Sequence, residues 1–411
     1  MTGARTGPRV WPAEGSTRVP YWAYTAPDVY ERERTNIFEG DSWAYVGLGA
    51  EIPNVGDYKT TFIGDIPVIV SRDRAGDVHV LRNKCAHRGV QVARLPYGNA
   101  SKFECPYHQW TYRPDGRLLG VPFKNGVLGH GGMPADFENA DHGLEVLRVA
   151  SRNGVIFASF GHPEPLDEYL GASMLTWFDR VFDGRPLRVL GTMKQRIPAN
   201  WKLMFENIKD PYHASLLHVF LVSFGLFRAD NPSSVAMDST GRHSVLVSAR
   251  RTGPVDASVA GEMASLRILE LEDKRLLDIV KEFDGPATVV MQTLWPNLIV
   301  QQQVNTLATR HIVPRGPDAF DLLWTFFGYE SDDEAMTERR LRHANFMGPA
   351  GFVSLDDSEV MYLAQNGAHA DNGSGSALVE MGGRDAEDTD HMVTEAALRA
   401  FYNHYREVMG L

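Results

Sequence analysis

The chain contains only two cysteines in 411 residues, and each lies within three positions of a histidine. Cys85 and His87 stand in the segment "CAHRG", while Cys105 and His108 stand in "CPYHQW". Each short segment therefore offers one thiolate and one imidazole, a pairing that points to a metal site rather than to a structural disulfide. A fold for this chain has to bring the two segments together.

Two kinds of metal centre use these residue types. A Rieske [2Fe-2S] cluster takes two thiolates on one iron and two neutral imidazoles on the other, so each segment would give one ligand to each iron. A zinc site also takes two cysteines and two histidines. Zinc-finger spacing usually keeps like ligands together, whereas here each pair is mixed. The mixed spacing favours the Rieske cluster, with a zinc-stabilised binding protein as the alternative.

The charge balance limits the partners of the chain. The 41 Lys and Arg residues face 52 Asp and Glu residues, giving a net charge of -11. This excess argues against a general binder of nucleic acids or membrane surfaces. The first residues contain no apolar core of a signal peptide, and no run of about eighteen apolar residues occurs. We therefore expect a cytoplasmic protein without a membrane span.

The length and the pattern predict two domains and an α+β fold. Residues 44–160 consist of short β-rich runs separated by Gly, Pro, Asp and Asn, which predicts a small all-β domain around the cluster segments. Residues 1–43 and 161–411 mix helices and strands and would form the second domain. Its expected elements are helices over 27–40, 203–224, 333–347, from Ser354 onward and over 394–410, an extended stretch over 188–203, and two strands within 296–316 joined near Asn305.

A second set of metal ligands is indicated by "FENIKDPYHASLLHVF". This segment places Asp210, His213 and His218 in the helix expected over 203–224. Histidines five residues apart in a regular helix diverge by roughly 140° around its axis. A bulge or a bend, of a kind often found at functional sites, is therefore needed for both to reach one metal.

A third ligand is wanted, because non-haem Fe(II) oxygenases use two histidines and one carboxylate on one face of the metal. The segment "GPAGFVSLDDSEV" offers Asp356 and Asp357. The alternative for this segment is helix capping, with Ser354 as the N-cap and Asp357 three residues later.

From "WAYVGLGAEIP" through the two cluster segments to "GPAGFVSLDD", the chain resembles the large (alpha) subunit of the Rieske non-haem iron oxygenases that hydroxylate aromatic rings. The resemblance implies an all-β Rieske domain joined to a catalytic domain of the helix-grip type, an antiparallel sheet with helices. It also implies a [2Fe-2S] cluster and a mononuclear Fe(II). Carried onto this sequence, the implied ligands are Cys85, His87, Cys105 and His108 for the cluster, and His213, His218 and Asp357 for the mononuclear iron.

The same resemblance gives roles to further residues. Asp210 becomes a carboxylate that links an iron histidine to a cluster histidine of the neighbouring subunit in a ring-shaped trimer. Asn207 joins Asp210 as a catalytic residue and, with Met347 and Val353, is expected to line the site of the substrate ring. Asp356 keeps a capping or supporting role.

The chain lacks both a GxGxxG motif after a strand and a Walker-type glycine loop, so it does not bind NADH or flavin by the usual motifs. A separate NADH-dependent reductase is therefore implied, with or without a ferredoxin. The resemblance also implies either an α3 trimer or an α3β3 hexamer completed by a small β subunit.

Substrate class is indicated by a finer resemblance. Stretches such as "RIPANWKLMFENIKDPYH" and "QQQVNTLATRHIVP" resemble most closely the branch with salicylate 5-hydroxylase and anthranilate dioxygenase, with terephthalate dioxygenase nearby. These substrates share a carboxylate. In the expected strand, alternation places Arg310 and His311 on opposite faces, so one of them can point into the concave side of the sheet. A bidentate grip by Arg310 on the carboxylate fits this pattern, and a surface ion pair is the alternative.

A dicarboxylate would want a second cation at the far end of the pocket. The segment "TDHMVTE" near the last helix offers His391 and Met392 and no arginine. We therefore predict that an ortho-substituted benzoate is hydroxylated with O2, by salicylate 5-hydroxylation or anthranilate dioxygenation. The alternatives are terephthalate 1,2-dioxygenation and, more remotely, a Rieske electron-transfer protein. The sequence leaves open whether one or two oxygen atoms are inserted.

Overall fold

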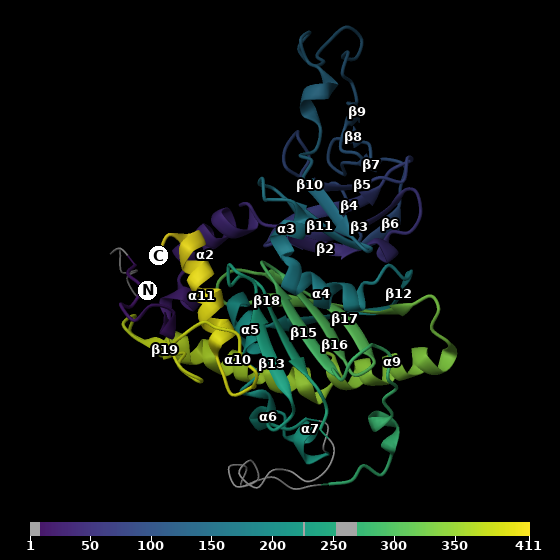
Figure 1. Cartoon of the computed structure of the whole chain (residues 1–411). Coiled ribbons are helices and arrows are strands. Elements are labelled where there is room, and N and C mark those ends of the chain that lie inside the picture. The colour runs from purple at the N-terminus through teal and green to yellow at the C-terminus, as the bar shows by residue number, and fades with distance from the viewer. Residues whose placement is uncertain (1–8, 225–226, 252–268) are drawn as a thin grey trace.

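The structure is a computed structural model that describes residues 9–224, 227–251 and 269–411 (Figure 1). A smaller upper part is built from short strands, and a larger lower part consists of one long antiparallel sheet with helices packed on it. This arrangement agrees with the expected α+β fold. No helix among the described residues is long and apolar enough to cross a membrane.

The upper part contains three small antiparallel sheets. The first has the order β5-β4-β3-β6, the second β10-β11-β2 and the third β7-β8-β9. Their strands are β2 (Ala44–Leu48), β3 (Asp57–Ile63), β4 (Ile66–Arg72), β5 (Val78–Arg82), β6 (Tyr97–Asn99), β7 (Phe103–Glu104), β8 (Thr111–Tyr112), β9 (Leu118–Gly120), β10 (Arg148–Arg152) and β11 (Val155–Ser159). Both cysteines lie beside the third sheet, in an apolar cluster separate from the main core.

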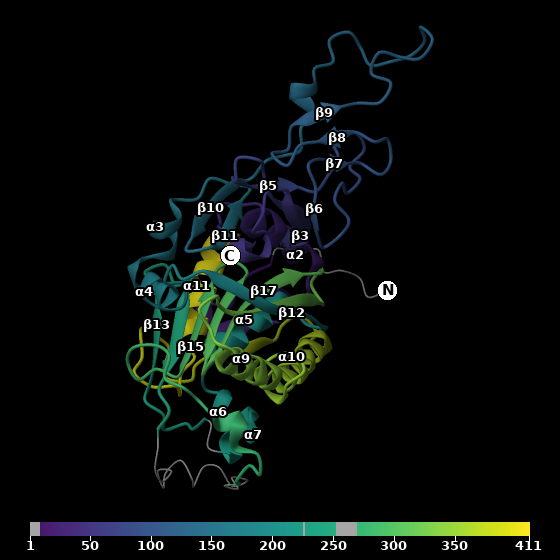
Figure 2. The same cartoon turned by 90° about the vertical axis from the view of Figure 1, so that its right-hand side faces the viewer.

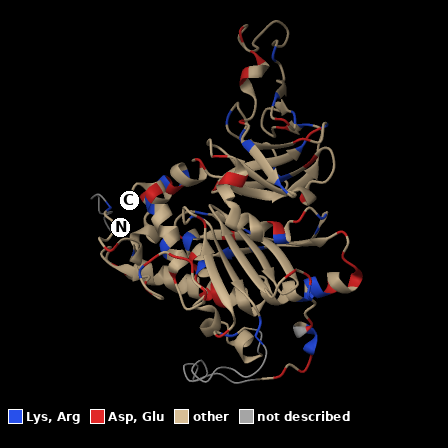
Figure 3. Ribbon diagram, in the orientation of Figure 1, with Lys and Arg blue, Asp and Glu red and all other residues tan. Residues whose placement is uncertain are grey.

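The lower part is organised by a seven-stranded sheet of order β12-β18-β17-β16-β15-β14-β13. Its strands are β12 (Leu187–Ile197), β13 (Ser233–Met237), β14 (Ser244–Ser248), β15 (Val289–Leu294), β16 (Leu298–Gln303), β17 (Thr306–Pro314) and β18 (Phe320–Tyr329). A two-residue turn at Val304 and Asn305 joins β16 to β17, as expected. Figure 3 shows few charged residues on the central strands and many on helices and loops.

Helices cover both sides of this sheet, with α4 on one side and α10 on the other (Figure 2). The helices of the described chain are α1 (Trp22–Thr25), α2 (Pro27–Glu33), α3 (Leu166–Leu170), α4 (Ala172–Val181), α5 (Trp201–Lys209), α6 (Ala214–Leu217), α7 (Val219–Ser223), α9 (Glu334–Met347), α10 (Phe352–Ala370) and α11 (Ala396–Met409). Shorter elements are the paired strands β1 (Arg18–Pro20) and β19 (Ser376–Leu378), a π-helical turn (Arg34–Phe38) after α2, and four 3-10 turns (Gly15–Thr17, Gly49–Glu51, Asn139–His142 and Lys274–Leu277).

Residues before position 44 pack against the last helix. The Trp11 ring lies 5.7 Å from the Tyr402 ring and 6.2 Å from the Tyr405 ring, measured between centroids. Deeper in the core, Nζ of Lys202 on α5 lies 2.5 Å from Oε1 of Glu33 on α2, and both side chains are fully buried. These contacts tie the two ends of the chain to α5, whose C-terminus leads into the candidate iron site.

Two expected elements differ from the structure. The single helix predicted over 203–224 is wrong, because α5 ends at Lys209 and two short helices follow. Pro211 causes the first break, since the residue before a proline disfavours the helical conformation and Asp210 has φ -99° and ψ 92°. The extended stretch predicted over 188–203 ends earlier, because Asn200 caps α5 by accepting a hydrogen bond from the Lys202 backbone at 3.1 Å.

Strand β17 joins the two parts of the molecule. His311 faces the upper part, where its ring meets the Tyr45 ring edge-on at 5.5 Å. Asn297 links the same groups: its Oδ1 accepts from the Tyr45 backbone at 2.8 Å, and its Nδ2 lies 2.9 Å from Nε2 of His311. Arg310, one residue earlier, faces the opposite side, as alternation along the strand predicts.

Two buried histidines make stability depend on pH. Burial lowers the pKa of His311, and that of His243, to about 3. An unfolded histidine titrates near 6.5, so between pH 6.5 and 3 the unfolded chain binds more protons than the folded chain. We expect the free energy of unfolding to fall below pH 6.5 by up to about 1.4 kcal/mol per pH unit for each of them.

Urea denaturation of wild type and His311→Gln at pH 7.5, 6.5 and 5.5 checks this prediction. Glutamine can still hydrogen-bond to Asn297 but does not titrate, so the variant should lose less stability between pH 6.5 and 5.5. An equal loss in both proteins would contradict the assignment of a neutral buried His311.

Candidate functional site

The two cluster segments fold into the same turn. The backbone N of Cys85 donates to the Val90 carbonyl, and that of Cys105 donates to the Trp110 carbonyl, each at 2.8 Å. The fifth residue of each turn has positive φ, 73° at Gly89 and 57° at Gln109, and its N–H donates back to the cysteine carbonyl. The two matched turns thus place their cysteines in equivalent positions, and the histidine is the third residue of the first turn and the fourth residue of the second.

Within these turns the sulfurs lie inside and the imidazoles outside. Cys85 and Cys105 are each 2% exposed, whereas His87 is exposed and His108 is half-buried. The two imidazole rings lie 4.6 Å apart, between centroids. Burial, together with His108 and Arg88, lowers the pKa of His87, which favours the neutral ring that binds metals. Two buried thiols and two outward-facing imidazoles form the donor set that would hold a [2Fe-2S] cluster of the Rieske type.

Tyr112 on β8 contacts one of the thiols. Its hydroxyl lies 3.1 Å from Sγ of Cys85 and accepts a hydrogen bond from the Ala86 backbone at 3.2 Å. A thiolate that binds a cluster carries no hydrogen and can only accept, so with the cluster in place the Tyr112 hydroxyl would donate to the sulfur. Hydrogen bonds to cluster sulfurs stabilise the reduced, more negative state and so raise the reduction potential.

Tyr112→Phe should therefore lower the reduction potential of the cluster by about 40 mV, the equivalent of about 1 kcal/mol in a one-electron couple. Redox titration followed by EPR of the reduced cluster measures this shift. The visible spectrum should be retained, because no ligand is changed. A potential within about 10 mV of wild type would show that the hydroxyl does not donate to the sulfur.

The second set of ligands comes from the break after α5 and from α10. Oδ1 of Asp210 accepts from the backbones of Tyr212 at 2.8 Å and His213 at 3.3 Å, which starts the next turn. His213 precedes α6, and His218, with φ -84° and ψ 67°, separates α6 from α7. The two histidines therefore flank a four-residue helix, and these breaks replace the bend that a continuous helix would have needed.

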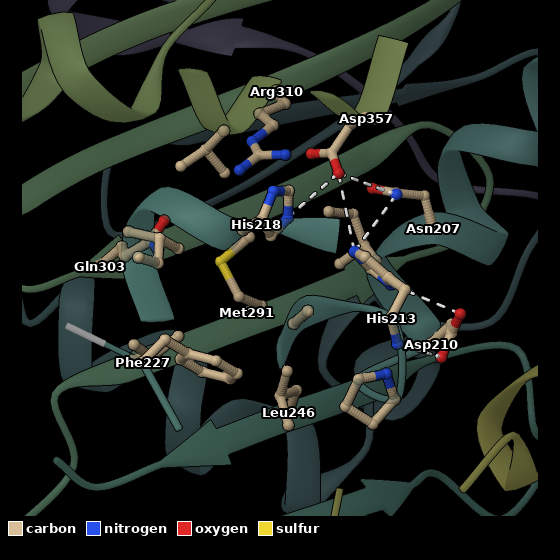
Figure 4. A pocket seen from close by; sticks show the side chains of 16 residues that line it. Asn207, Asp210, His213, His218, Phe227, Leu246, Met291, Gln303, Arg310 and Asp357 are labelled. Carbon is tan, nitrogen blue, oxygen red and sulfur yellow. Dashed lines mark hydrogen bonds and ion pairs between the residues drawn. The ribbon is translucent and has the colours of Figure 1, made fainter. Parts of the chain in front are cut away.

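His213, His218 and Asp357 converge, with their ligand atoms all within 4.8 Å of one another. Oδ1 of Asp357 lies 3.3 Å from Nε2 of His218 and 3.6 Å from Nε2 of His213 (Figure 4). Two imidazole nitrogens and one carboxylate oxygen at one point form the donor set that non-haem Fe(II) oxygenases use. The three side chains could thus hold the metal.

A carboxylate lies behind each of these histidines. Oδ2 of Asp210 is 3.4 Å from Nδ1 of His213, and Oδ2 of Asp356 is 3.3 Å from Nδ1 of His218. Such partners hold the ring nitrogen facing the metal in its unprotonated form. The capping alternative for this segment is wrong, since α10 begins at Phe352 and Ser354 lies inside it.

The charges in the site support one another. Burial opposes the protonated form of His213, but the nearby carboxylates of Asp210 and Asp357, 3.4 Å and 3.6 Å from its two ring nitrogens, outweigh burial and raise its pKa to about 10. Burial alone would raise the pKa of Asp357, whereas its hydrogen bonds with His213 and His218 hold that pKa well below the usual range. The site thus attracts positive charge at the point where a cation would sit.

A cavity opens beside the three ligands, between α5–α7 and the face of the sheet that carries Arg310. Asn207 stands at its rim, where its Nδ2 donates to Oδ1 of Asp357 at 3.1 Å. Of the predicted pocket residues, Asn207, Val353 and Arg310 line this cavity. Met347 does not line it and lies in the same apolar cluster as Val353. The lining also includes Leu221, Phe227, Leu246, Val289, Met291 and Gln303, which the sequence did not single out.

The residues that the sequence missed come from the sheet and from the segment around α7. Leu246, Met291 and Gln303 lie on neighbouring strands and share the sheet face with Arg310. The alternation of side chains along a strand would have placed these residues on the face of Arg310, but only with the knowledge that β14, β15 and β16 are adjacent. Met392, which the sequence analysis named, does not line the cavity and is buried in the apolar cluster with Val353.

The chain has two turns with the ligands of a [2Fe-2S] cluster, and a 2-His-1-carboxylate site beside an apolar cavity. Together these two sites define an oxygenase of the Rieske non-haem iron class. Residues 42–130 match the family described as Rieske [2Fe-2S] domain, and residues 185–411 match the family described as Ring hydroxylating alpha subunit (catalytic domain). The chain belongs to the family of ring-hydroxylating oxygenase alpha subunits. It is an oxidoreductase whose cofactors are a Rieske cluster and Fe(II), and it works with a reductase and O2.

Similar proteins cover nearly the whole chain. It is 52% identical to the large oxygenase component of salicylate 5-hydroxylase from Ralstonia sp, over 97% of this chain and 96% of that protein. It is 43% identical to the large subunit of anthranilate 1,2-dioxygenase from Burkholderia cepacia (97% and 95%), and 38% identical to subunit alpha 2 of the terminal oxygenase component of terephthalate 1,2-dioxygenase from Comamonas sp (97% and 97%).

A solved structure with the same fold is naphthalene 1,2-dioxygenase from Rhodococcus sp. bound to indole. It has a TM-score of 0.78 and 26% sequence identity, over 95% of this chain and 94% of that one. The Rieske match decides against the zinc alternative, and the match over 185–411 decides against a Rieske protein that only carries electrons.

Proposed function

We propose that this subunit hydroxylates an aromatic monocarboxylate with an ortho hydroxyl or amino group, by salicylate 5-hydroxylation or anthranilate 1,2-dioxygenation. The observation that carries the proposal is Arg310. Its side chain lines the cavity and the residue is 3% exposed, yet no ion pair joins it to a carboxylate among the described residues. Burial lowers the pKa of Arg310 to about 9, although the Asp357 carboxylate acts to raise it. The guanidinium therefore stays charged at neutral pH.

A buried cation without a paired anion is costly, and a substrate carboxylate would offset that cost. The guanidinium lies over the Trp324 ring at 4.1 Å, which holds its plane in place. Two of its five N–H groups go to Gln301, so three donors remain for a ligand. This geometry suits a carboxylate that accepts two parallel hydrogen bonds.

A second carboxylate would find no comparable partner among the described residues that line the cavity. Arg310 is the sole Lys or Arg among the sixteen residues that line the cavity, and the rest of the lining apart from the metal site is mainly apolar. This supports a monocarboxylate over terephthalate. The relatives named above are oxygenases of salicylate, anthranilate and terephthalate, so sequence identity alone does not choose among these three acids. The residues of the cavity are the better guide.

We further propose the following assignments. Cys85 and Cys105 would bind one cluster iron and His87 and His108 the other, and His213, His218 and Asp357 would bind the mononuclear iron. When bound, the cluster supplies single electrons and the Fe(II) site activates O2 for attack on the ring. The side chains of the cavity position the reactants. Arg310 orients the acid, and Asn207 holds the Asp357 carboxylate. Leu246 and Met291 exclude water.

The assembly and setting also belong to the proposal. Asp210 would link His213 to a cluster histidine of a neighbouring subunit in an α3 trimer or an α3β3 hexamer, and a reductase, with or without a ferredoxin, would supply electrons from NADH. The Rieske domain would comprise 44–160 and the catalytic domain 1–43 with 161–411, in a cytoplasmic enzyme.

Product analysis tests the function. The iron-loaded oxygenase, a surrogate reductase and NADH are offered salicylate, anthranilate, benzoate and terephthalate in parallel under 18O2. Hydroxylated product from salicylate or anthranilate is expected, and the 18O count shows whether one or two atoms enter. Turnover of terephthalate alone would overturn the monocarboxylate proposal.

A further inference from the structure

Two polar side chains, Gln303 and Arg310, interrupt the apolar floor of the cavity, and the buried Gln301 links them. Arg310 stands directly opposite Ile299 in the β16–β17 ladder, so its side chain shares a face with Gln301 and Gln303. Gln303 and Arg310 line the cavity together with apolar neighbours such as Met291 (Figure 4). Gln301 is fully buried and hydrogen-bonds to both polar neighbours.

The orientation of both amides follows from Arg310. A guanidinium only donates, so the amide atom that faces it must be the oxygen. Nε of Arg310 donates to Oε1 of Gln301 at 2.7 Å, and Nη2 donates to the same oxygen. Nε2 of Gln301 is therefore the atom that meets Gln303, and it donates to Oε1 of Gln303 at 2.9 Å.

This relay decides what Gln303 can offer to a substrate. Its carbonyl oxygen is turned toward Gln301, from which it accepts, and its NH2 group has no hydrogen-bond partner among the described residues, so the NH2 group is the part of the amide left to meet a ligand. The cavity thus presents two kinds of group at its polar side, the remaining N–H donors of Arg310 and the N–H donors of Gln303. Both groups donate, so a ligand must offer hydrogen-bond acceptors to them.

We infer that Gln303 selects a benzoate whose ortho substituent is a hydrogen-bond acceptor, so that the site prefers 2-hydroxybenzoate to 2-aminobenzoate. The inference rests on the proposed function, in which Arg310 holds the carboxylate. In a 2-hydroxybenzoate the hydroxyl hydrogen bonds to its own carboxylate and leaves oxygen lone pairs directed outward. In a 2-aminobenzoate the second N–H points outward and the nitrogen lone pair is withdrawn into the ring, so donor would face donor.

Ligand binding without turnover tests the inference. Equilibrium dialysis of the iron-loaded oxygenase under nitrogen, without reductase, gives Kd for salicylate, anthranilate and benzoate. Gln303→Met removes the donor at similar length, and we expect salicylate to bind about tenfold more weakly while benzoate changes less than about twofold. If salicylate and benzoate lost affinity equally, the Gln303 amide would contact the carboxylate, and the inference would be overturned. Unchanged affinity for both acids would also overturn it.

A second variant tests the relay itself. Gln301→Glu supplies only acceptors, so Gln303 should turn its NH2 group toward the new carboxylate and present its carbonyl to the cavity. The added negative charge should weaken all three acids, but the ratio of Kd for anthranilate to Kd for salicylate should fall about tenfold. A ratio unchanged from wild type would show that Gln301 does not orient Gln303.

Two controls keep the outcomes distinct. Gln302→Met changes the same residue type one position away on the opposite face, where Gln302 accepts from Arg180 at 3.1 Å, and it should leave the Kd ratios unchanged. Arg310→Ala should weaken all three acids; if it weakens none, the proposed function itself has failed. Should Gln303→Met not retain iron, Gln303→Asn withdraws the amide by one methylene and should give the same selective loss.

Discussion

Asp210→Asn is expected to retain both metal centres and yet form product at least about a hundredfold more slowly. Asparagine keeps the Oδ1 acceptor that Asp210 offers to the Tyr212 and His213 backbones, so the turn after α5 should persist. What is lost is the negative oxygen 3.4 Å from Nδ1 of His213. In the proposed assembly the Asp210 carboxylate also accepts a hydrogen bond from a cluster histidine of the neighbouring subunit. An asparagine amide has one acceptor oxygen and one NH2 donor, so it cannot accept from both imidazoles as a carboxylate can.

Iron and sulfide content, the EPR signal of the reduced cluster and single-turnover product yield together measure this effect. The matched control is Asp356→Asn, which removes the carboxylate behind His218 but lies outside the proposed electron path. We expect the control to be several times more active than Asp210→Asn. Loss of iron from Asp210→Asn would reassign Asp210 to holding the metal, and full activity would contradict any role in electron transfer.

Arg310→Ala is expected to raise KM for benzoate-type substrates by one to two orders of magnitude, roughly the 1.5 to 3 kcal/mol of a charge-assisted hydrogen bond. The alanine leaves Gln301 without its donor but creates no buried charge, so the β16–β17 ladder should remain intact. The value of kcat should change less than KM, because a grip on the carboxylate acts in the ground state and the transition state alike.

Steady-state kinetics with salicylate and with phenol, which lacks the carboxylate, measures this grip. For phenol the variant and the wild type should differ little, since Arg310 has nothing to hold. An unchanged KM for salicylate would mean that the Arg310 guanidinium is satisfied by Gln301 and Trp324 and does not contact the acid.

The cluster segments were the part of the site that the sequence predicted most fully. Cys85 with His87 and Cys105 with His108 are pairs within single turns, so their spacing alone favoured a Rieske cluster over a zinc site. The alternation of Arg310 and His311 was predictable for the same reason, because the period of a strand is local. In each case the evidence lies within a few residues.

Other features depended on distant contacts. The break after α5 had a local signal in Pro211, but the way in which two short helices aim His213 and His218 at Asp357 depends on how α10 packs. The cavity floor needs the register of β14 to β17, which alternation alone does not give. Met347, at the end of α9, was expected in the lining, yet it packs in the apolar cluster with Val353 and does not line the cavity.

Strand β17 performs two tasks with adjacent residues, since Arg310 faces the cavity and His311 faces Tyr45 of the upper part. Inserting or deleting a single residue there would exchange the two faces and abolish both contacts at once. Changes of substrate range in this family, natural or engineered, should therefore arise by substitution on β14 to β17. Length variation should be confined to the loops that join these strands, where it leaves the register untouched.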